Sequence, residues 1–348
     1  MSNRSKNVSM TATIRDVARL AGVAVSTVSL VVNNKGRVSK KTEAKVKQAV
    51  EQLDYHPQRS ARGLVTQRSG NFGFILSTDH FSQAEPFYTK IFLGTEFEAR
   101  SFDYYILLTT IDKHFNADRA PRFLLERNVD GVILVGTVPH KIVDYIAMRD
   151  LPIVLVDYDL PDTKHSAVLI DNVGGIRAIV HHLIKLGHCR FAFIGGDMKH
   201  PGMSQRFNAF QQTLADAGLC VDNDCVAAEE EMSGIETGYT LMQKLLPHHN
   251  KFTAVVAAND AMAVGAVRAC QGNGFHVPND FSITGFDDVE SAQNLHPALT
   301  TVHVPKEKMG AIALRQLVDM IKNTAEYGTK ITIPVRLIIR ESSNQPRS

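Results

Sequence analysis

The sequence of 348 residues predicts a mixed α/β protein, with a small helical head followed by a larger body of two lobes. Three observations lead to this fold class. Apolar residues repeat at helical spacing between residues 14 and 53, whereas beyond residue 70 short apolar runs alternate with helix-length segments. The charge also changes sign: residues 1–70 contain 13 Lys and Arg against 4 Asp and Glu, and the rest contains 25 against 32.

The basic head predicts a polyanionic partner, although a solvated basic face would produce the same charge. A content of 44% hydrophobic and 21% charged residues is ordinary for a soluble globular protein. No apolar run has the length of a membrane span, and the first ten residues lack the apolar stretch of a secretory signal, so we expect a short disordered leader. The four cysteines contain no CxxC pair, which favours the reducing cytoplasm and argues against a metal site.

The head begins with a helix predicted over residues 14–21. Its apolar positions i, i+3, i+4 and i+7 are Ile14, Val17, Ala18 and Ala21. Thr13 can cap this helix, with Asp16 completing an approximate capping box. Gly22 then ends the helix, since glycine accepts the positive φ of a helix C-cap.

The next stretch, VAVSTVSLVV (residues 23–32), is rich in β-branched residues and by composition favours a strand. Strand alternation fails, however, because Val23 and Val25 would lie on one face and Val28 on the other. At 100° per residue the apolar side chains gather on one side, so the helical period is the better fit. Two short helices separated by a turn at Gly22 form a helix-turn-helix, whose second helix enters the DNA major groove.

A third helix is expected after Ser39, which is a good N-cap. Its apolar positions, which close a small core, are Val46, Ala49, Val50 and Leu53. Pro57 ends this helical run, and residues 58–65 could form one short helix, too short to be stable alone. We therefore expect this segment to become ordered only when a partner holds it.

The body, residues 71–342, is predicted to contain two α/β lobes. Its apolar runs are residues 72–76, 104–111, 129–136, 151–158, 167–171, 189–196, 254–260, 281–288, 299–304 and 333–342. Runs of this kind, buried on both faces, are typical of parallel sheets with helical crossovers. Ten strands in about 270 residues are many for one sheet, which favours two.

Polar residues recur at the carboxyl ends of these runs, where open α/β sheets place their ligand sites. They are Asp79, Asp157, Asp171, Asn259, Asp260, Asp287 and Asp288. Any single Asp there is as often a helix cap, but the set suits a polyhydroxylated ligand, because a carboxylate or amide can bond two adjacent hydroxyls. Arg206 could add a charged donor. Apolar walls could come from Phe81, Phe87, Tyr88 and Phe286, for which core packing is the other interpretation.

No other pattern indicates chemistry. Of the histidines in HHLIKLGH only His181 and His188 share a helix face, which does not predict a metal site. No Ser/His/Asp arrangement has a catalytic context, so we expect neither enzymatic activity nor a cofactor.

One ungapped stretch, residues 13–64, carries a resemblance to a known family: TIRDVARLAGVAVSTVSLVVNNKGRVSKKTEAKVKQAVEQLDYHPQRSARGL. It is similar to the DNA-binding head of the LacI/GalR family of bacterial transcription regulators. The resemblance implies that the recognition helix and its flanks contact DNA through Thr13, Val25, Ser26, Thr27, Ser29, Leu30, Asn33, Arg37, Ser39 and Tyr55. It also implies a hinge helix that opens the minor groove, with Gln58, Arg59, Ala61 and the wedge Leu64.

Three positions depart from the family pattern. Leu30 stands where the family usually has Arg, Ala24 where it often has Ser, and Gln58 where it has Asn. An Arg can bond guanine through two donors, worth about 1–3 kcal/mol of discrimination, whereas Leu can only touch a thymine methyl group or exclude a wrong base. The alternative is that Leu30 packs in the small core. The resemblance therefore predicts an operator that differs at this base pair.

Three phrases of the body carry a second resemblance: LIDNVGGIRAIVHHLIKLGHCRFAFIGG, FTAVVAANDAMAVGAVRAC and VPNDFSITGFDDVESAQNLHPALTTVHVP. They are similar to the family's effector domain, which is shaped like periplasmic sugar-binding proteins. The resemblance implies effector contacts by Arg206, Asn259, Asp260 and Asp287, followed by Asp79, Asp157 and Asp171. It also implies one lobe of about residues 71–170 and 304–332, and another of about 171–303 with the final strand.

The predicted parts are a leader (1–10), a helix-turn-helix domain (11–57), a hinge helix and linker (58–70), an effector-binding and dimerisation domain (71–342) and a tail (343–348). The resemblance implies a repressor that binds a palindromic operator as a homodimer and responds to a sugar-like effector. A sugar-binding receptor or a sugar-processing α/β enzyme is the alternative, but neither explains residues 11–66. The sequence leaves open which effector binds, and whether it releases or promotes DNA binding.

Overall fold

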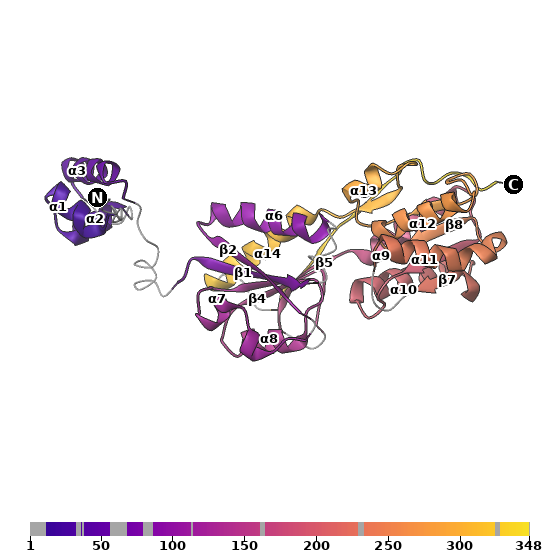
Figure 1. The fold of residues 1–348 in the computed structure, drawn as a ribbon, viewed down its shortest axis with the longest axis horizontal. Coiled ribbons are helices and arrows are strands. Elements are labelled where there is room, and N and C mark those ends of the chain that lie inside the picture. The colour runs from indigo at the N-terminus through magenta and orange to yellow at the C-terminus, as the bar shows by residue number, and fades with distance from the viewer. Residues whose placement is uncertain are drawn as a thin grey trace, which may run out of the picture. The chain divides into compact units, whose positions relative to one another are not determined.

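In the computed structural model the chain divides into two compact units, Met1–Ser69 and Gly70–Ser348 (Figure 1). The structure describes residues 12–32, 36, 38–55, 68–78, 86–112, 114–160, 164–228, 233–323 and 328–347. Outside these lie the predicted leader, the predicted hinge helix and the predicted site residues Asn33, Arg37, Gln58, Arg59, Ala61, Leu64, Asp79 and Phe81.

In the described part of the first unit, the helices α1 (Ile14–Ala21), α2 (Val25–Val32) and α3 (Lys40–Gln52) pack around one small core. Val28 on α2 has no exposed surface, and Val31 is 7% exposed. The valine-rich stretch is therefore helical, as predicted, because burying one apolar face outweighs the β propensity of its residues.

The helix ends of this unit follow from their local sequence. The Asp16 carboxylate accepts hydrogen bonds from the backbone N–H of Thr13 at 3.0 Å and from its hydroxyl at 2.6 Å. Gly22 ends α1 with a φ of 66°. Ser39 Oγ accepts the Thr42 N–H at 3.2 Å and begins α3. The capping residues predicted from the sequence are confirmed at all three places.

Lobe one of the second unit is a six-stranded parallel sheet with the order β11-β5-β4-β3-β1-β2. Its strands are β1 (Asn71–Ser77), β2 (Tyr105–Ile111), β3 (Val132–Val135), β4 (Ile153–Val156), β5 (Ser166–Ile170) and β11 (Lys330–Ile333). Helices α6 (Pro86–Ser101) and α14 (Lys306–Ile321) cover one face, and α7 (Arg122–Leu125) and α8 (His140–Ala147) cover the other (Figure 1). The central strands are buried on both faces, as their continuous apolar runs predict.

Lobe two is a four-stranded parallel sheet with the order β7-β6-β8-β9. Its strands are β6 (Phe191–Gly195), β7 (Val226–Ala228), β8 (Ala254–Ala257) and β9 (Ser282–Thr284). Its helices are α9 (Asn172–Lys185), α10 (Pro201–Asp216), α11 (Ile235–Leu245), α12 (Asp260–Gly272) and the short α13 (Glu290–Gln293). Single turns of 3₁₀ helix lie at Ala117–Arg119 and Asn223–Cys225, and a longer one at Leu246–Lys251.

Within the described residues the chain passes between the lobes three times: from β5 to α9, from β10 (Thr301–His303) to α14, and from β11 to β12 (Arg336–Ile338). β10 and β12 form a small antiparallel pair. The prediction of one strand over residues 333–342 is therefore wrong. β11 ends at Ile333 in lobe one, and the next residue, Pro334, has no N–H to donate to a strand ladder.

Paired glycines bring two helices of each lobe into backbone contact. A Cβ on Gly94 of α6 would overlap the Glu307 carbonyl of α14, and a Cβ on Gly310 of α14 would overlap the Ile91 carbonyl of α6. Gly238 and Gly265 do the same for α11 and α12. Each lobe therefore contains a helix pair packed so closely that no side chain separates the two backbones at these glycines. No described helix is long and apolar enough to cross a membrane.

Candidate functional sites in the head and between the lobes

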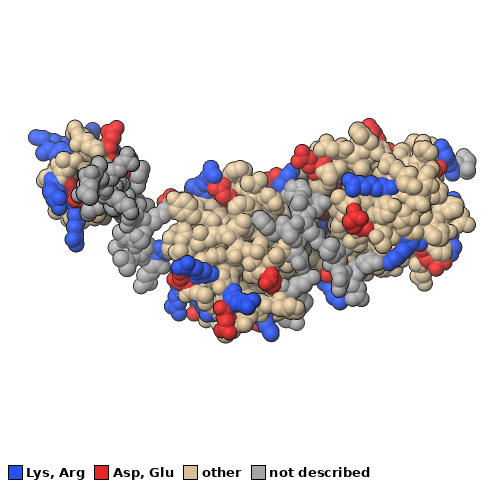
Figure 2. Space-filling view, in the orientation of Figure 1, with Lys and Arg blue, Asp and Glu red and all other residues tan. Residues whose placement is uncertain are grey.

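The second helix of the head exposes residues predicted to face DNA. Val25 and Leu30 are 42% and 41% exposed, and Ser26 is exposed as well, whereas Val28 and Val31 face the core. Leu30 does not pack in the head core, so the alternative interpretation of this residue is wrong. Figure 2 shows several Lys and Arg side chains on the visible face of this unit.

The other described residues predicted to contact DNA have local partners. Thr13 and Ser39 cap α1 and α3, where free backbone N–H groups also favour a phosphate. Thr27 and Ser29 are half-buried on α2. Tyr55 is 8% exposed, and burial raises the pKa of its hydroxyl. The structure gives Tyr55 a packing role in the head, and DNA contacts by these residues remain predictions.

In the body, Arg206 of α10 is the centre of a polar cluster and is 4% exposed. Its Nε donates to Asn172 Oδ1 at 2.8 Å, and its Nη1 donates to the Ala258 carbonyl at 2.6 Å. Its Nη2 lies 3.4 Å from Asp287 Oδ1. The guanidinium carbon stands 3.7 Å from the centre of the Phe286 ring. Three elements of lobe two therefore hold this guanidinium in one orientation.

Lobe one contributes Asp157, which follows β4 with a φ of 68°. The hydroxyl of Tyr88 on α6 donates to Asp157 Oδ2 at 2.9 Å. Burial raises the pKa of Asp157 to about 6, although the charge of Arg206 and the Tyr88 hydrogen bond act in the opposite direction. The charge of Arg206 in lobe two therefore acts on this buried carboxylate of lobe one.

Asp287 lies beyond the end of β9 and has a φ of 116°, which few non-glycine residues adopt. Burial raises its pKa to about 6, against the charges of Arg206 and Lys306. The ammonium of Lys306 donates to the Asp287 backbone carbonyl. Charged groups of both lobes thus meet at this residue.

Three other residues predicted to bind the effector are engaged within the fold. Asp171 caps α9 by accepting the Gly174 N–H at 2.8 Å. Asn259 caps α12 and also donates to the Ser233 carbonyl. Asp260 has no exposed surface, and its two oxygens accept the Thr301 hydroxyl and the Val289 N–H. Each of these three has the structural role of a cap or a buried bridge.

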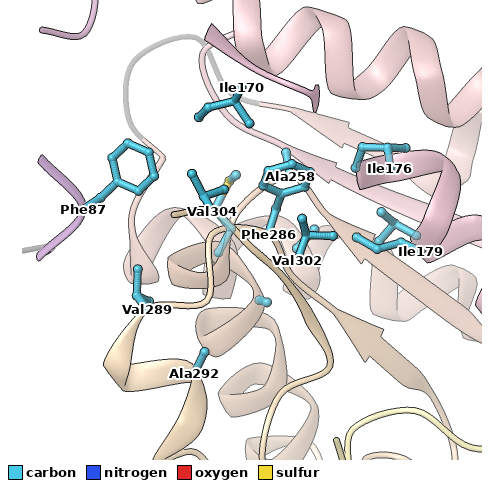
Figure 3. Packing of buried hydrophobic residues seen from close by; sticks show 14 of the residues in the cluster. Phe87, Ile170, Ile176, Ile179, Ala258, Phe286, Val289, Ala292, Val302 and Val304 are labelled. Atoms are coloured by element: carbon cyan, nitrogen blue, oxygen red, sulfur yellow. The ribbon is translucent and has the colours of Figure 1, made fainter. Parts of the chain in front are cut away.

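Two aromatic residues predicted as apolar walls of the site, Phe286 and Phe87, are also packed within the fold. Phe286 is fully buried beneath Arg206 and packs with Ala258, Val302 and Val304 (Figure 3). Phe87 of α6 is 8% exposed, and its ring meets that of Tyr88 edge to face at 5.0 Å between centroids. Phe286 therefore supports the guanidinium from below rather than lining an open wall.

His200 is a site residue that sequence reasoning missed. Its Nδ1 accepts the Gly202 N–H at 3.1 Å, so in the neutral ring Nε2 carries the proton. Nε2 is buried, and no described residue pairs with it. Burial lowers the pKa of His200 to about 4, and the Arg206 charge acts in the same direction. A histidine before Pro201 has no sequence signal beyond a capping position.

The cluster offers hydrogen-bonding groups rather than reactive ones. Two cations, Arg206 and Lys306, face two carboxylates, Asp157 and Asp287, and this near balance suits an uncharged polar ligand. Among the described residues no group of three His, Cys, Asp or Glu side chains could hold a metal ion.

The raised pKa of Asp157 predicts a pH-dependent effect of Asp157→Asn. The pKa of the Asp157 carboxyl is about 6 in the folded state, against an ordinary value of 3.8. Between these two pH values the carboxyl therefore keeps its proton in the folded state and loses it in the unfolded state. The free energy of unfolding of the wild type should therefore fall relative to the variant as the pH rises from 4 through 6, by about 1.4 kcal/mol per unit of pKa difference. Urea unfolding at half-unit pH intervals measures this difference, and asparagine tolerates the positive φ.

Asp222→Asn is the matched control. A backbone hydrogen bond from Asp224 and the Lys251 ammonium hold the pKa of Asp222 below 3.8. The difference in free energy of unfolding between the wild type and Asp222→Asn should therefore stay constant above pH 4.5. If the free energy of unfolding of the wild type stayed constant or rose relative to that of Asp157→Asn from pH 4 to 6, Asp157 would not be protonated in the folded protein.

Two family profiles match the chain. Residues 13–58 match "Bacterial regulatory proteins, lacI family", and residues 180–343 match "Periplasmic binding protein-like domain". The regulator RegA of Clostridium saccharobutylicum is 33% identical over 96% of this chain and 100% of its own.

Solved structures agree with this match. The lac repressor dimer bound to operator has a TM-score of 0.83 and 26% identity, over 96% of this chain and 100% of that one. The complex of the transcriptional regulator CelR with cellobiose has a TM-score of 0.72 and 30% identity, over 95% of this chain and 99% of that one.

A helix-turn-helix unit joined to a two-lobed α/β body, with a polar cluster between the lobes, defines a transcriptional regulator of the repressor type. The chain belongs to the lacI family of bacterial regulatory proteins, and the predicted fold is confirmed in its two units and two parallel sheets.

Proposed function

We propose that this regulator represses transcription by binding a near-palindromic operator as a homodimer, under the control of a small polyhydroxylated effector. Residues 11–57 bind the major groove, residues 58–70 form the hinge, and residues 71–342 bind the effector and dimerise. The protein works in the cytoplasm and catalyses no reaction. The relative solved as a dimer on its operator, and the relative solved with cellobiose, support this proposal.

The observation that carries the effector site is the buried pair of Arg206 and Asp287 in lobe two, 3.4 Å apart, whose charges also act on the hydrogen-bonded Tyr88 and Asp157 of lobe one. Two of the five N–H groups of Arg206 have no partner among the described residues, and neither has Nε2–H of His200. A ligand with several hydroxyls supplies acceptors for these donors, and donors for the carboxylates of Asp157 and Asp287. Binding in this place closes the lobes on the ligand and changes their relative placement.

A gel-shift titration of the full chain tests the DNA-binding function. The operator is selected from a randomised DNA pool and compared with a scrambled duplex at increasing salt. We expect specific affinity at the selected site and a steep loss of affinity with salt, because released counterions drive the association. Equal affinity for both duplexes would contradict the proposal.

A thermal-shift screen over sugars, sugar acids and nucleosides tests the effector class. A ligand at 100 times its dissociation constant stabilises the folded state by about 2.7 kcal/mol, which is well within detection. Stabilisation by nucleosides and by no sugar would contradict a sugar-like effector.

Leu30→Arg is expected to change the base preference of the operator. The exposed position of Leu30 on α2 lets an Arg reach a base edge, where bonding to guanine adds about 1–3 kcal/mol, roughly a fivefold to 150-fold preference. Gel shifts with the four possible base pairs at each half-site position measure this preference.

Leu20→Arg is the matched control. Leu20 is 50% exposed on α1, so this substitution adds the same charge away from the recognition helix. It should raise the affinity for every sequence alike and steepen the salt dependence. If Leu30→Arg behaved in the same uniform way, Leu30 would not stand at a base edge.

A further inference from the structure

Lys306 is a buried ammonium that neither the sequence patterns nor the proposed effector contacts explain. It is the first residue of α14 and is 2% exposed. Burial lowers its pKa, while the carboxylates of Asp287 and Asp260 act in the opposite direction. An apolar side chain of similar length would fill this space without the cost of removing a charge from water. Packing alone therefore does not require a lysine here.

The Lys306 ammonium reaches across to lobe two and bonds its backbone. It donates to the carbonyl of Asp287, and it lies 3.4 Å from the carbonyl of Asp288. These two residues are consecutive and both have positive φ, 116° and 54°. A backbone in this region is held by its surroundings rather than by its own preference. The lysine is thus one of the groups that fix the turn carrying the Asp287 carboxylate.

The other end of Lys306 is anchored in lobe one. Its backbone begins α14, which packs on α6 in direct backbone contact through Gly94 and Gly310. Its Nζ also lies 5.7 Å from the centre of the Phe87 ring of α6, within the range of a cation–π contact. The backbone of this lysine therefore belongs to a close helix pair of lobe one.

We propose that Lys306 is a positioning residue that ties the Asp287–Asp288 turn of lobe two to lobe one and so sets the relative placement of the lobes. A ligand that bonds the Asp287 carboxylate then acts on a residue whose carbonyl is held from lobe one. This last step rests on the proposed function, whereas the tie between the lobes does not.

The experiment measures the distance between the lobes in the full chain without ligand or DNA. One spin label is placed at Met148→Cys, which is 76% exposed after α8 of lobe one, and the other at the native exposed Cys220 of lobe two. Cys189, also exposed, is changed to serine. Labelled protein is diluted with unlabelled protein, so that pulsed electron resonance reports distances within one chain.

Three variants are compared with the wild type in this background. Lys306→Met keeps the length of the side chain and removes the donors, and we expect a broader or shifted distance distribution. Lys306→Arg keeps a charged donor and should return towards the wild type. Lys308→Met, an exposed lysine on the same helical turn, should leave the distribution unchanged.

A distribution for Lys306→Met that matches the wild type would overturn the proposal. A shift shared by Lys308→Met would also overturn it, because a general loss of helix charge would then be the cause. If circular dichroism showed that Lys306→Met does not fold, Lys306→Gln takes its place, with the same expected and contrary results. Failure of the wild type to bind a selected operator would contradict the proposed function and leave this distance result unaffected.

Discussion

Replacing Arg206 by methionine is expected to destabilise the body by about 3–5 kcal/mol at pH 8, the cost of removing one partner of a buried ion pair. Methionine fills part of the space but leaves Asn172, the Ala258 carbonyl and Asp287 without their donors. Asp287, whose pKa burial already raises to about 6, then takes up a proton at higher pH rather than stay charged. At pH 5 this carboxyl is protonated in both proteins, so the destabilisation should be smaller there.

Urea unfolding at pH 5 and pH 8 measures both values. Arg268→Met is the matched control, since Arg268 is exposed on α12 and its loss should cost less than about 0.5 kcal/mol at either pH. Adding Asp287→Asn to Arg206→Met should recover part of the stability at pH 8, which a double-mutant cycle reports. Equal destabilisation at both pH values would mean that Asp287 is not the partner that matters.

Gly94→Ala is expected to destabilise lobe one by about 3 kcal/mol, at the upper end of the usual cost of overpacking. Its new methyl group would overlap the backbone carbonyl of Glu307, which no side-chain rotation relieves. The helices α6 and α14 must separate, and α14 begins with Lys306. We therefore expect a lower urea midpoint and, in the spin-labelled background, a shifted distance between the lobes.

Gly272→Ala is the matched control for this change. Gly272 is exposed at the end of α12, and an added Cβ there meets only the Tyr239 hydroxyl at 3.9 Å. The substitution should be neutral or stabilise by about 0.4–1 kcal/mol, because alanine restricts the unfolded chain. If Gly94→Ala were as mild as Gly272→Ala, the two helices would not be in backbone contact.

The elements that the sequence predicted well are those decided by neighbouring residues. Asp16 bonds Thr13 and Ser39 bonds Thr42 within one helical turn, so the starts of α1 and α3 needed no tertiary information. Long apolar runs in the body likewise marked the central strands. Strands at the edges were missed or merged: β7 has three residues, and β11 is separated from β12 by Pro334.

The cluster between the lobes was predicted in part. The sequence placed Asp157, Arg206 and Asp287 near strand ends or on a helix, as it did Asp171 and Asn259. Which of them meet could not be read from it, because a carboxylate at a strand end can as easily cap the next helix, as Asp171 does. His200 and Lys306 were missed because burial, which no local pattern encodes, gives them their importance.

The sequence by itself determined a helix-turn-helix head, a two-lobed α/β body and an outward-facing Leu30, since periodicity and capping act over a few residues. Only the tertiary structure decided that Arg206 of lobe two pairs with Asp287, that Asp260 is a buried bridge, and that Lys306 of lobe one holds the turn at Asp287. These relations join residues far apart in the chain. Charged groups interact more strongly away from water than in it. The buried, water-poor surroundings of these residues form only once both lobes are folded.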